Sequence, residues 1–156
     1  MRLRRLLPLT ATAALALAAC GDDDPPPVPL SCTGDRAPIV RALAAAPGRV
    51  TLDANGITIS ECLRRATSTA DLQEVGITLS NAGEDLELLA LQGDADAALQ
   101  LGYLAGAARE GAKTTSGLGE ELVLRLEASA GAAASSGIAP VVAAVNRGTK
   151  AGAARG

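Results

Sequence analysis

Apolar residues recur every three or four positions between residues 70 and 92, the spacing of one face of an α-helix. The stripe consists of Leu72, Val75, Leu79, Ala82, Leu86 and Leu89. Ser68 supplies a start signal for this helix and Gly93 a stop signal. Further apolar residues lie off the stripe, at Ile77, Leu88 and Leu91, so we expect the helix to be buried on more than one side.

Weaker periodic patterns predict additional helices over 35–46, 61–66, 95–110 and 118–129. Ser60 and Asp94 are the expected caps of the second and third of these helices. In the helix over 118–129, the inward side is expected to carry Leu118, Leu122, Val123 and Leu126. The pattern therefore favours an all-α fold, a small bundle of four to five helices.

Residues 50–60 change period, because apolar and polar residues alternate there on both sides of Asn55-Gly56. Asn-Gly is the preferred pair for a two-residue turn between two antiparallel strands. One short β-hairpin near 50–60 is therefore an additional expectation. A lone hairpin is only marginally stable, so it would have to pack on the helices.

The C-terminal segment is rich in alanine and glycine and gives a weak pattern. Pro140 is a possible first residue of a last short helix, and Gly148–Gly156 is expected to be disordered. We accordingly expect a helical domain over 35–130, followed by a short helix and a flexible tail over 131–156.

The first twenty residues have the organisation of a secretory signal. Arg2, Arg4 and Arg5 precede an uncharged apolar stretch over residues 6–19. That stretch has 14 residues, whereas a helix needs about 20 to span a bilayer. We therefore expect residues 1–19 to be a signal peptide that is removed.

The signal ends in Leu17-Ala18-Ala19-Cys20, which resembles the lipobox of bacterial lipoproteins. The resemblance implies that Cys20 receives lipid, becomes the first residue of the mature chain and is then acylated at its amine. It further implies an extracytoplasmic protein that acyl chains such as palmitate anchor to the cell membrane. Gly21 occupies the position where an Asp would favour inner-membrane retention, so the choice of membrane stays open. The alternative is an ordinary signal peptide with an unrelated Cys at its end.

Residues 20–34 form an acidic, proline-rich segment that we interpret as a tether. Removal of residues 1–19 leaves 137 residues with 11 basic and 17 acidic side chains, a formal charge of −6. An acidic chain with one Tyr and no Phe or Trp lacks the basic and stacking surfaces that nucleic acids need. We therefore expect the lipid membrane and an envelope protein as partners, and no nucleic acid.

Cys32 and Cys62 remain as a pair once lipid occupies Cys20. An even number of cysteines in an oxidising compartment predicts a Cys32–Cys62 disulfide. Two free thiols are the alternative, because spacing alone does not show that the side chains meet.

Residues 93–104 resemble half of a Sel1-type repeat, through Gly93-Asp94-Ala95-Asp96-Ala97 and Leu101-Gly102-Tyr103-Leu104. That family stacks helix pairs into a scaffold for other proteins, but the sequence contains one copy where a solenoid needs about three. The favoured alternative is a capped helix with a close-packed glycine. Gly102 and Gly106 then indicate a close approach of another helix within the domain.

Candidate catalytic chemistry is sparse. The sequence has no His, no Gly-rich phosphate loop and no pair of closely spaced cysteines. The adjacent carboxylates are Asp94/Asp96, Glu84/Asp85/Glu87 and Glu120/Glu121, which we interpret as helix-start and surface residues. We therefore expect no catalytic residue, no metal site and no cofactor. The leading hypothesis is a non-enzymatic interaction module, with a small apolar-ligand-binding module and a carboxylate-based hydrolase as alternatives.

Overall fold

The computed structural model describes residues 26–115 and 117–156, and the predicted lipidation residue Cys20 lies outside them. Within this part of the chain the fold is all-α, as predicted, and contains no β-strand. Its elements are the 3-10 turn η1 (Leu30–Cys32) and the helices α1 (Arg36–Leu43), α2 (Ile59–Arg65), α3 (Thr69–Leu91), α4 (Ala95–Ala112), α5 (Leu118–Ala134) and α6 (Ala139–Arg155).

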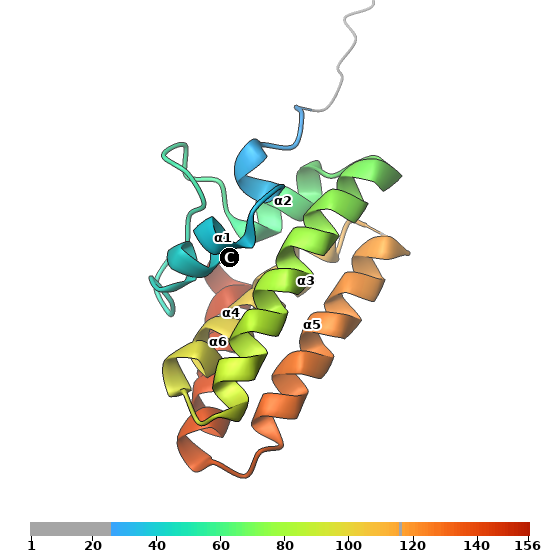
Figure 1. Cartoon of the computed structure of the whole chain (residues 1–156). Helices are drawn as coiled ribbons and strands as arrows, with labels where there is room; N and C mark the ends of the chain where they lie inside the picture. The colour runs from blue at the N-terminus through green and yellow to red at the C-terminus, as the bar shows by residue number, and fades with distance from the viewer. Residues whose placement is uncertain (1–25, 116) are drawn as a thin grey trace, which may run out of the picture.

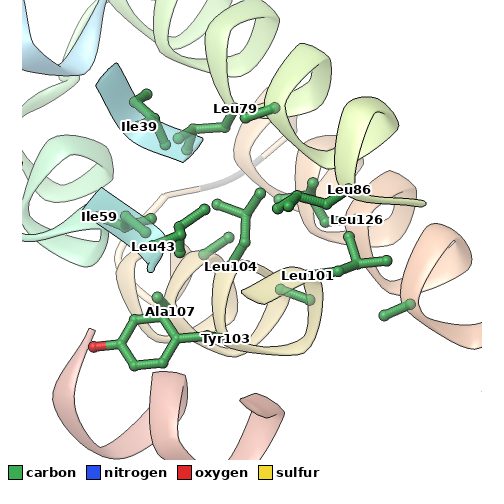
Figure 2. Packing of buried hydrophobic residues seen from close by; sticks show 14 of the residues in the cluster. Ile39, Leu43, Ile59, Leu79, Leu86, Leu101, Tyr103, Leu104, Ala107 and Leu126 are labelled. Carbon is green, nitrogen blue, oxygen red and sulfur yellow. The ribbon is translucent and has the colours of Figure 1, made fainter. Parts of the chain in front are cut away.

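Helix α4 forms the centre of the bundle, and α2, α3, α5 and α6 all pack on it (Figure 1). Helices α3 and α5 lie side by side and run in the same direction, and α4 runs back behind them, with α6 on the other side of α4. Figure 2 shows this order in section, because the side chains of α4 point both toward α3 and toward α6. The central position explains why α4 is buried almost all round.

The core is aliphatic, because the chain offers no Phe or Trp to fill it. Leucine and isoleucine side chains from five helices meet in it (Figure 2), at Ile39, Leu43, Ile59, Leu79, Leu86, Leu101, Leu104 and Leu126. Tyr103 is the one aromatic residue and is fully buried. Its hydroxyl accepts a hydrogen bond of 3.1 Å from the backbone N–H of Val50, so its polar end is satisfied.

The starts of α1 to α4 carry side-chain caps, whereas α5 and α6 begin without one. Asp35 caps α1, Asp94 caps α4, and Ser68 forms a reciprocal capping box with Asp71 at the start of α3. The predicted cap of α2 is wrong by two residues. Thr58 caps that helix, and Ser60 lies buried in its first turn.

The expected hairpin near 50–60 does not form. Residues 49–58 are a loop in which two backbone hydrogen bonds, from Leu52 N–H to the carbonyl of Ile57 and from Gly56 N–H to the carbonyl of Asp53, close the turn around Asn55-Gly56. The N–H of Val50 bonds to Tyr103 instead of a second strand, and the side chains of Val50 and Ile57 are buried. Packing on the helices therefore replaces the inter-strand hydrogen bonds that the alternation of apolar and polar residues had predicted.

The C-terminal segment is also more ordered than predicted. Helix α5 continues to Ala134, and α6 runs without interruption to Arg155, through the residues expected to be disordered. Gly148 and Gly152 of α6 lie against the backbone of α4. The end of α6 is held too, because Arg155 donates to the carbonyl of Pro47 and Ser60 donates to the carbonyl of Gly156.

Candidate functional site

The predicted disulfide is present. Cys32 and Cys62 are bonded, with their Cα atoms 5.5 Å apart, and both are fully buried. The bond joins η1 to α2, so it fixes the point at which the N-terminal segment enters the helical domain. The folded part therefore begins at Leu30, a few residues earlier than the sequence indicated.

The adjacent carboxylates are spread over helix ends and outer faces. Asp94 accepts hydrogen bonds from the N–H groups of Asp96 and Ala97, the contacts of a helix cap. Glu120 and Glu121 occupy the first turn of α5, where negative charge suits the helix dipole. The described residues contain no group of three His, Cys, Asp or Glu residues arranged to hold a metal ion.

Two ionisable groups have shifted pKa values, and both belong to structural contacts. A hydrogen bond to Asp85, on α3, raises the pKa of Arg36, on α1. Burial acts to raise the pKa of Asp53, but hydrogen bonds from Ile57 N–H and the Ser31 hydroxyl, among others, outweigh it and lower that pKa. The Arg36–Asp85 contact joins α1 to α3, and the Ser31–Asp53 contact joins the N-terminal segment to the loop over 49–58. Neither contact forms a reaction centre.

The glycine pair Gly102 and Gly106 lies where another helix of the same domain approaches, as the sequence indicated. A Cβ atom on either residue would collide with the backbone of α6 near Thr149. Reciprocally, Gly148 and Gly152 of α6 lie against the backbone of α4 around Tyr103. The segment that resembles a Sel1-type repeat is thus the α3–α4 corner and the buried first half of α4.

The most extended concave surface lies between α3 and α5 on the outer side of the bundle. It consists of three successive hollows of about 540, 250 and 410 Å³. The first two share Leu72 and Leu118, and the last two share Ser80, Glu84, Glu121 and Arg125. We call this surface the α3/α5 groove. From Thr69 to Glu87 it follows α3 for roughly 27 Å, at a rise of about 1.5 Å per residue.

Exposed apolar side chains lie in and beside the groove. Ile77 is 63% exposed and Leu118 is 40% exposed, and both line the middle hollow. This overturns two expectations, that α3 is buried on more than one side and that Leu118 points inward. Leu88 and Leu91, which lie off the predicted stripe of α3, are also exposed, at 62% and 46%. Leu89, the last residue of the stripe itself, is 45% exposed, so the buried part of the stripe ends at Leu86.

The groove is acidic at its rim. Glu84 and Glu121 line both the middle and the last hollow, and Glu87 lines the last. Arg125 lies between these carboxylates, and Arg64 lines the first hollow. Arg125 is paired with Glu121 at 2.9 Å, four residues apart on α5. The surface thus combines an apolar centre with an excess of negative charge, and it offers no arrangement of nucleophile and base.

A second, more apolar hollow of about 350 Å³ lies between the end of α4 and the start of α5. Ala112, Val123 and Leu124 line it, with Arg109 and Lys113 from α4 and Glu120 from α5 at its edge. Leu124 is 62% exposed there. Arg109 is paired with Glu127 and Lys113 with Glu110, so the basic groups at this edge are already partly neutralised.

None of the described helices has the length and hydropathy that crossing a membrane requires. Comparison with protein families, curated proteins and solved structures finds no match to this chain. The function must therefore be inferred from the residues and surfaces described above.

The sequence did not identify the groove. Its one available signal was the presence of Ile77, Leu88 and Leu91 outside the stripe of α3, which also fits a helix buried on two sides. The two interpretations differ only in whether a neighbour covers these residues. That depends on where α5 lies, and α5 leaves the side of α3 that carries Ile77 uncovered.

Proposed function

We propose that this chain is a lipid-anchored, extracytoplasmic bacterial protein that acts as a non-enzymatic interaction module. Its lipobox-like Leu17-Ala18-Ala19-Cys20 supplies the anchor, and the proline-rich segment supplies a tether of roughly 30 Å. The buried Cys32–Cys62 disulfide supports this assignment, because such bonds persist in oxidising compartments.

We propose the α3/α5 groove as the partner-binding surface and a basic amphipathic helix of another envelope protein as its occupant. The observation that carries this proposal is the exposure of Ile77 and Leu118 within a groove rimmed by Glu84, Glu87 and Glu121. Burial of apolar surface contributes about 25 cal/mol per Å². Lys or Arg residues flanking the apolar side of the partner helix would complement the acidic rim.

The shape of the groove fits a helix. Two parallel helices leave a straight furrow, and an amphipathic helix can place residues spaced three and four apart into it. A length of roughly 27 Å corresponds to a partner helix of about 18 residues. The first hollow, near Thr67 and Thr115, adds hydroxyl groups at the end where α3 and α5 begin.

The anchor is tested by mass spectrometry of the protein purified from bacterial membranes. The expected mature chain begins at Cys20 and carries acyl chains on it, and Cys20→Ser is expected to be unmodified and released from the membrane. A Cys20 that carries no lipid in the membrane-derived protein would refute the anchoring proposal.

The groove is tested with a photo-crosslinking residue placed at Ile77 in living cells. We expect one adduct whose crosslinked segment is an amphipathic helix with basic flanks. The same residue at Ala143, exposed on α6, should not give that adduct.

The variant that should disrupt partner binding is Leu118→Glu, which adds a negative charge at the middle hollow of the groove. Its control is Leu124→Glu, at a leucine on the same helix that lies outside the groove and is 62% exposed against 40% for Leu118. Loss of the adduct in Leu118→Glu alone supports the proposal. Equal adducts from Ile77 and Ala143, or an adduct with an acidic segment, would refute it.

The hollow between α4 and α5 favours a second candidate function, the binding of a small apolar molecule. Its lining is almost wholly apolar, with aliphatic parts of Arg109 and Lys113 beside Val123 and Leu124. Native mass spectrometry of protein from cells would detect a co-purified lipid-like ligand. We expect Val123→Glu to abolish that binding, whereas a ligand retained in this variant would exclude the hollow as its site.

A further inference from the structure

Charge is unevenly distributed along the folded chain. Residues 69–134, which contain α3, α4 and α5, hold eleven acidic and three basic side chains, a formal charge of −8. Residues 139–156, which contain α6, hold three basic side chains and no acidic one. The net charge of the chain is negative, but the side chains of α6 are basic and those of α3, α4 and α5 are mainly acidic.

The cations of α6 lie on its outer side. Val141, Val145, Gly148 and Gly152 are buried, whereas Arg147 and Lys150 are exposed on the opposite side of the helix. Ala143 and Ala154 are exposed beside them, at helical spacing. Small neighbours leave the two cations as the most protruding groups of this surface. No salt bridge within the described residues involves Arg147 or Lys150.

Further basic groups lie near the C-terminal end of α6. Arg155 donates a hydrogen bond of 2.7 Å to the carbonyl of Pro47, which lies two residues before the exposed Arg49. We call Arg49, Arg147, Lys150 and Arg155 the basic face. The acidic Asp94 and Asp96 lie near the other end of α6, because Gly93 lies against Ile138.

The basic face lies at the end of the bundle that receives the tether. Gly156 is bonded to Ser60 of α2, and α2 is joined to η1 by the Cys32–Cys62 disulfide. Figure 1 shows the C-terminal end beside α1 and α2, with α6 behind α4 and the pair α3 and α5 in front. The middle and last hollows of the groove and the exposed Arg147 and Lys150 of α6 thus lie on different sides of α4, whereas the first hollow reaches Arg64, which bonds to Ser60.

We propose that the basic face contacts the anionic headgroups of the membrane that holds the chain, so that the α3/α5 groove faces away from the bilayer. The orientation rests on the proposed attachment near Cys20. Charges act over about one Debye length, roughly 10 Å at moderate salt, so the local face matters more than the negative net charge. Each Lys or Arg near an anionic bilayer strengthens association by about fivefold.

Because the tether holds the domain at the membrane, weak contacts between the basic face and the lipid headgroups are sufficient to orient it. An attached domain stays at high effective concentration beside the surface, so a few charges can select one orientation among many. The same arrangement keeps the acidic rim of the groove away from like-charged lipid. It therefore presents the apolar centre of the groove to a partner that approaches from the periplasmic or extracellular side.

The chain allows a clean test, because it contains no Trp. Single-Trp reporters are placed at Ala154, on α6 beside the basic face, and at Ile77, in the groove. The chain beginning at Cys20 is coupled through that thiol to a maleimide lipid in vesicles, and quenching by headgroup nitroxide lipids is measured. In vesicles that contain phosphatidylglycerol we expect strong quenching at position 154 and weak quenching at position 77. In pure phosphatidylcholine vesicles we expect the difference to disappear.

Charge reversal provides the decisive variant. Arg147→Glu with Lys150→Glu should lower quenching at position 154 to the phosphatidylcholine level. Arg36→Glu with Arg65→Glu changes net charge equally, at residues that line neither the groove nor the hollow between α4 and α5, and should leave the pattern unchanged. Far-UV circular dichroism confirms that each variant is folded.

Equal quenching of the two reporters would overturn the proposal and leave an acidic protein surface as the partner of the basic face. Chemical coupling at Cys20 makes the result independent of acylation in the cell. A chain that is not lipidated in bacteria would refute the anchor proposal without changing this outcome.

Discussion

The contact between α4 and α6 gives the most specific prediction about stability. At Gly152, an added Cβ atom would lie 2.9 Å from the backbone nitrogen of Ala107 and 2.8 Å from the carbonyl carbon of Tyr103, and closer still to the carbonyl oxygen of Tyr103. These obstacles are backbone atoms, so no side-chain rotation can remove them. Gly152→Ala therefore requires the two helices to move apart.

The expected loss follows from two opposing contributions. Overpacking a well-packed interior costs about 1–3 kcal/mol, and a rigid backbone obstacle places this site at the upper end. Alanine in place of glycine in a helix interior returns about 1 kcal/mol. We therefore expect Gly152→Ala to lower the free energy of unfolding by about 2 kcal/mol.

Urea unfolding followed by far-UV circular dichroism measures this free energy. Gly76→Ala is the matched control, because this α3 glycine has no atom within 4 Å of its added Cβ. The control should gain about 0.5–1 kcal/mol from helix propensity. If Gly152→Ala is as stable as the unsubstituted chain, or if Gly76→Ala is destabilised equally, the steric reasoning is refuted.

Three further predictions concern the loop and the N-terminal segment. Tyr103→Phe leaves the buried N–H of Val50 without its partner and should lower the free energy of urea unfolding by about 1–3 kcal/mol. A smaller loss would mean that water reaches this N–H. Replacing Cys32 and Cys62 by Ser opens a 30-residue separation and should cost about 3–4 kcal/mol in the chain-entropy model. Intact mass before and after reduction should show the bond in the unsubstituted chain. Because the folded pKa of Asp53 lies below 3.8, its contribution to stability is complete above that pH and is lost as pH falls through the folded pKa. Below pH 3.8, the free energy of unfolding of Asp53→Asn should therefore fall less than that of the unsubstituted chain. Identical acid-unfolding curves for the two proteins would contradict the lowered pKa of Asp53.

Helices α1 to α5 were largely predictable, because their sequences carry local signals. The stripe of α3 and the caps at Ser68 and Asp94 depend on residues within a few positions of one another. Gly93 adopts a positive φ of 97° after α3, the conformation that a glycine stop signal supplies. The disulfide was predictable from the number of cysteines, because Cys32 and Cys62 are left as a pair once Cys20 is assigned to lipid.

The errors occurred where a distant neighbour decides the structure. Val50 and Ile57 alternate like strand residues, but Tyr103 and the helical core bind this segment as a loop. Helix α6 has an alanine- and glycine-rich sequence that is weakly helical by itself. It is held because its glycines allow backbone contact with α4 and because both Arg155 and Gly156 are bonded to distant residues.

The candidate surfaces, too, depend on contacts between residues that are distant in the sequence. The amino-acid sequence by itself predicted the helical class and the cysteine pairing, which the structure confirms, and it predicted an export signal ending at Cys20. Only the tertiary structure decided that Ile77 and Leu118 remain exposed in a groove, and that the cations of α6 lie on the other side of the bundle. The physical reason is range. Helix propensity, capping and charge act between residues close in sequence, whereas exposure depends on which distant helix covers a given face.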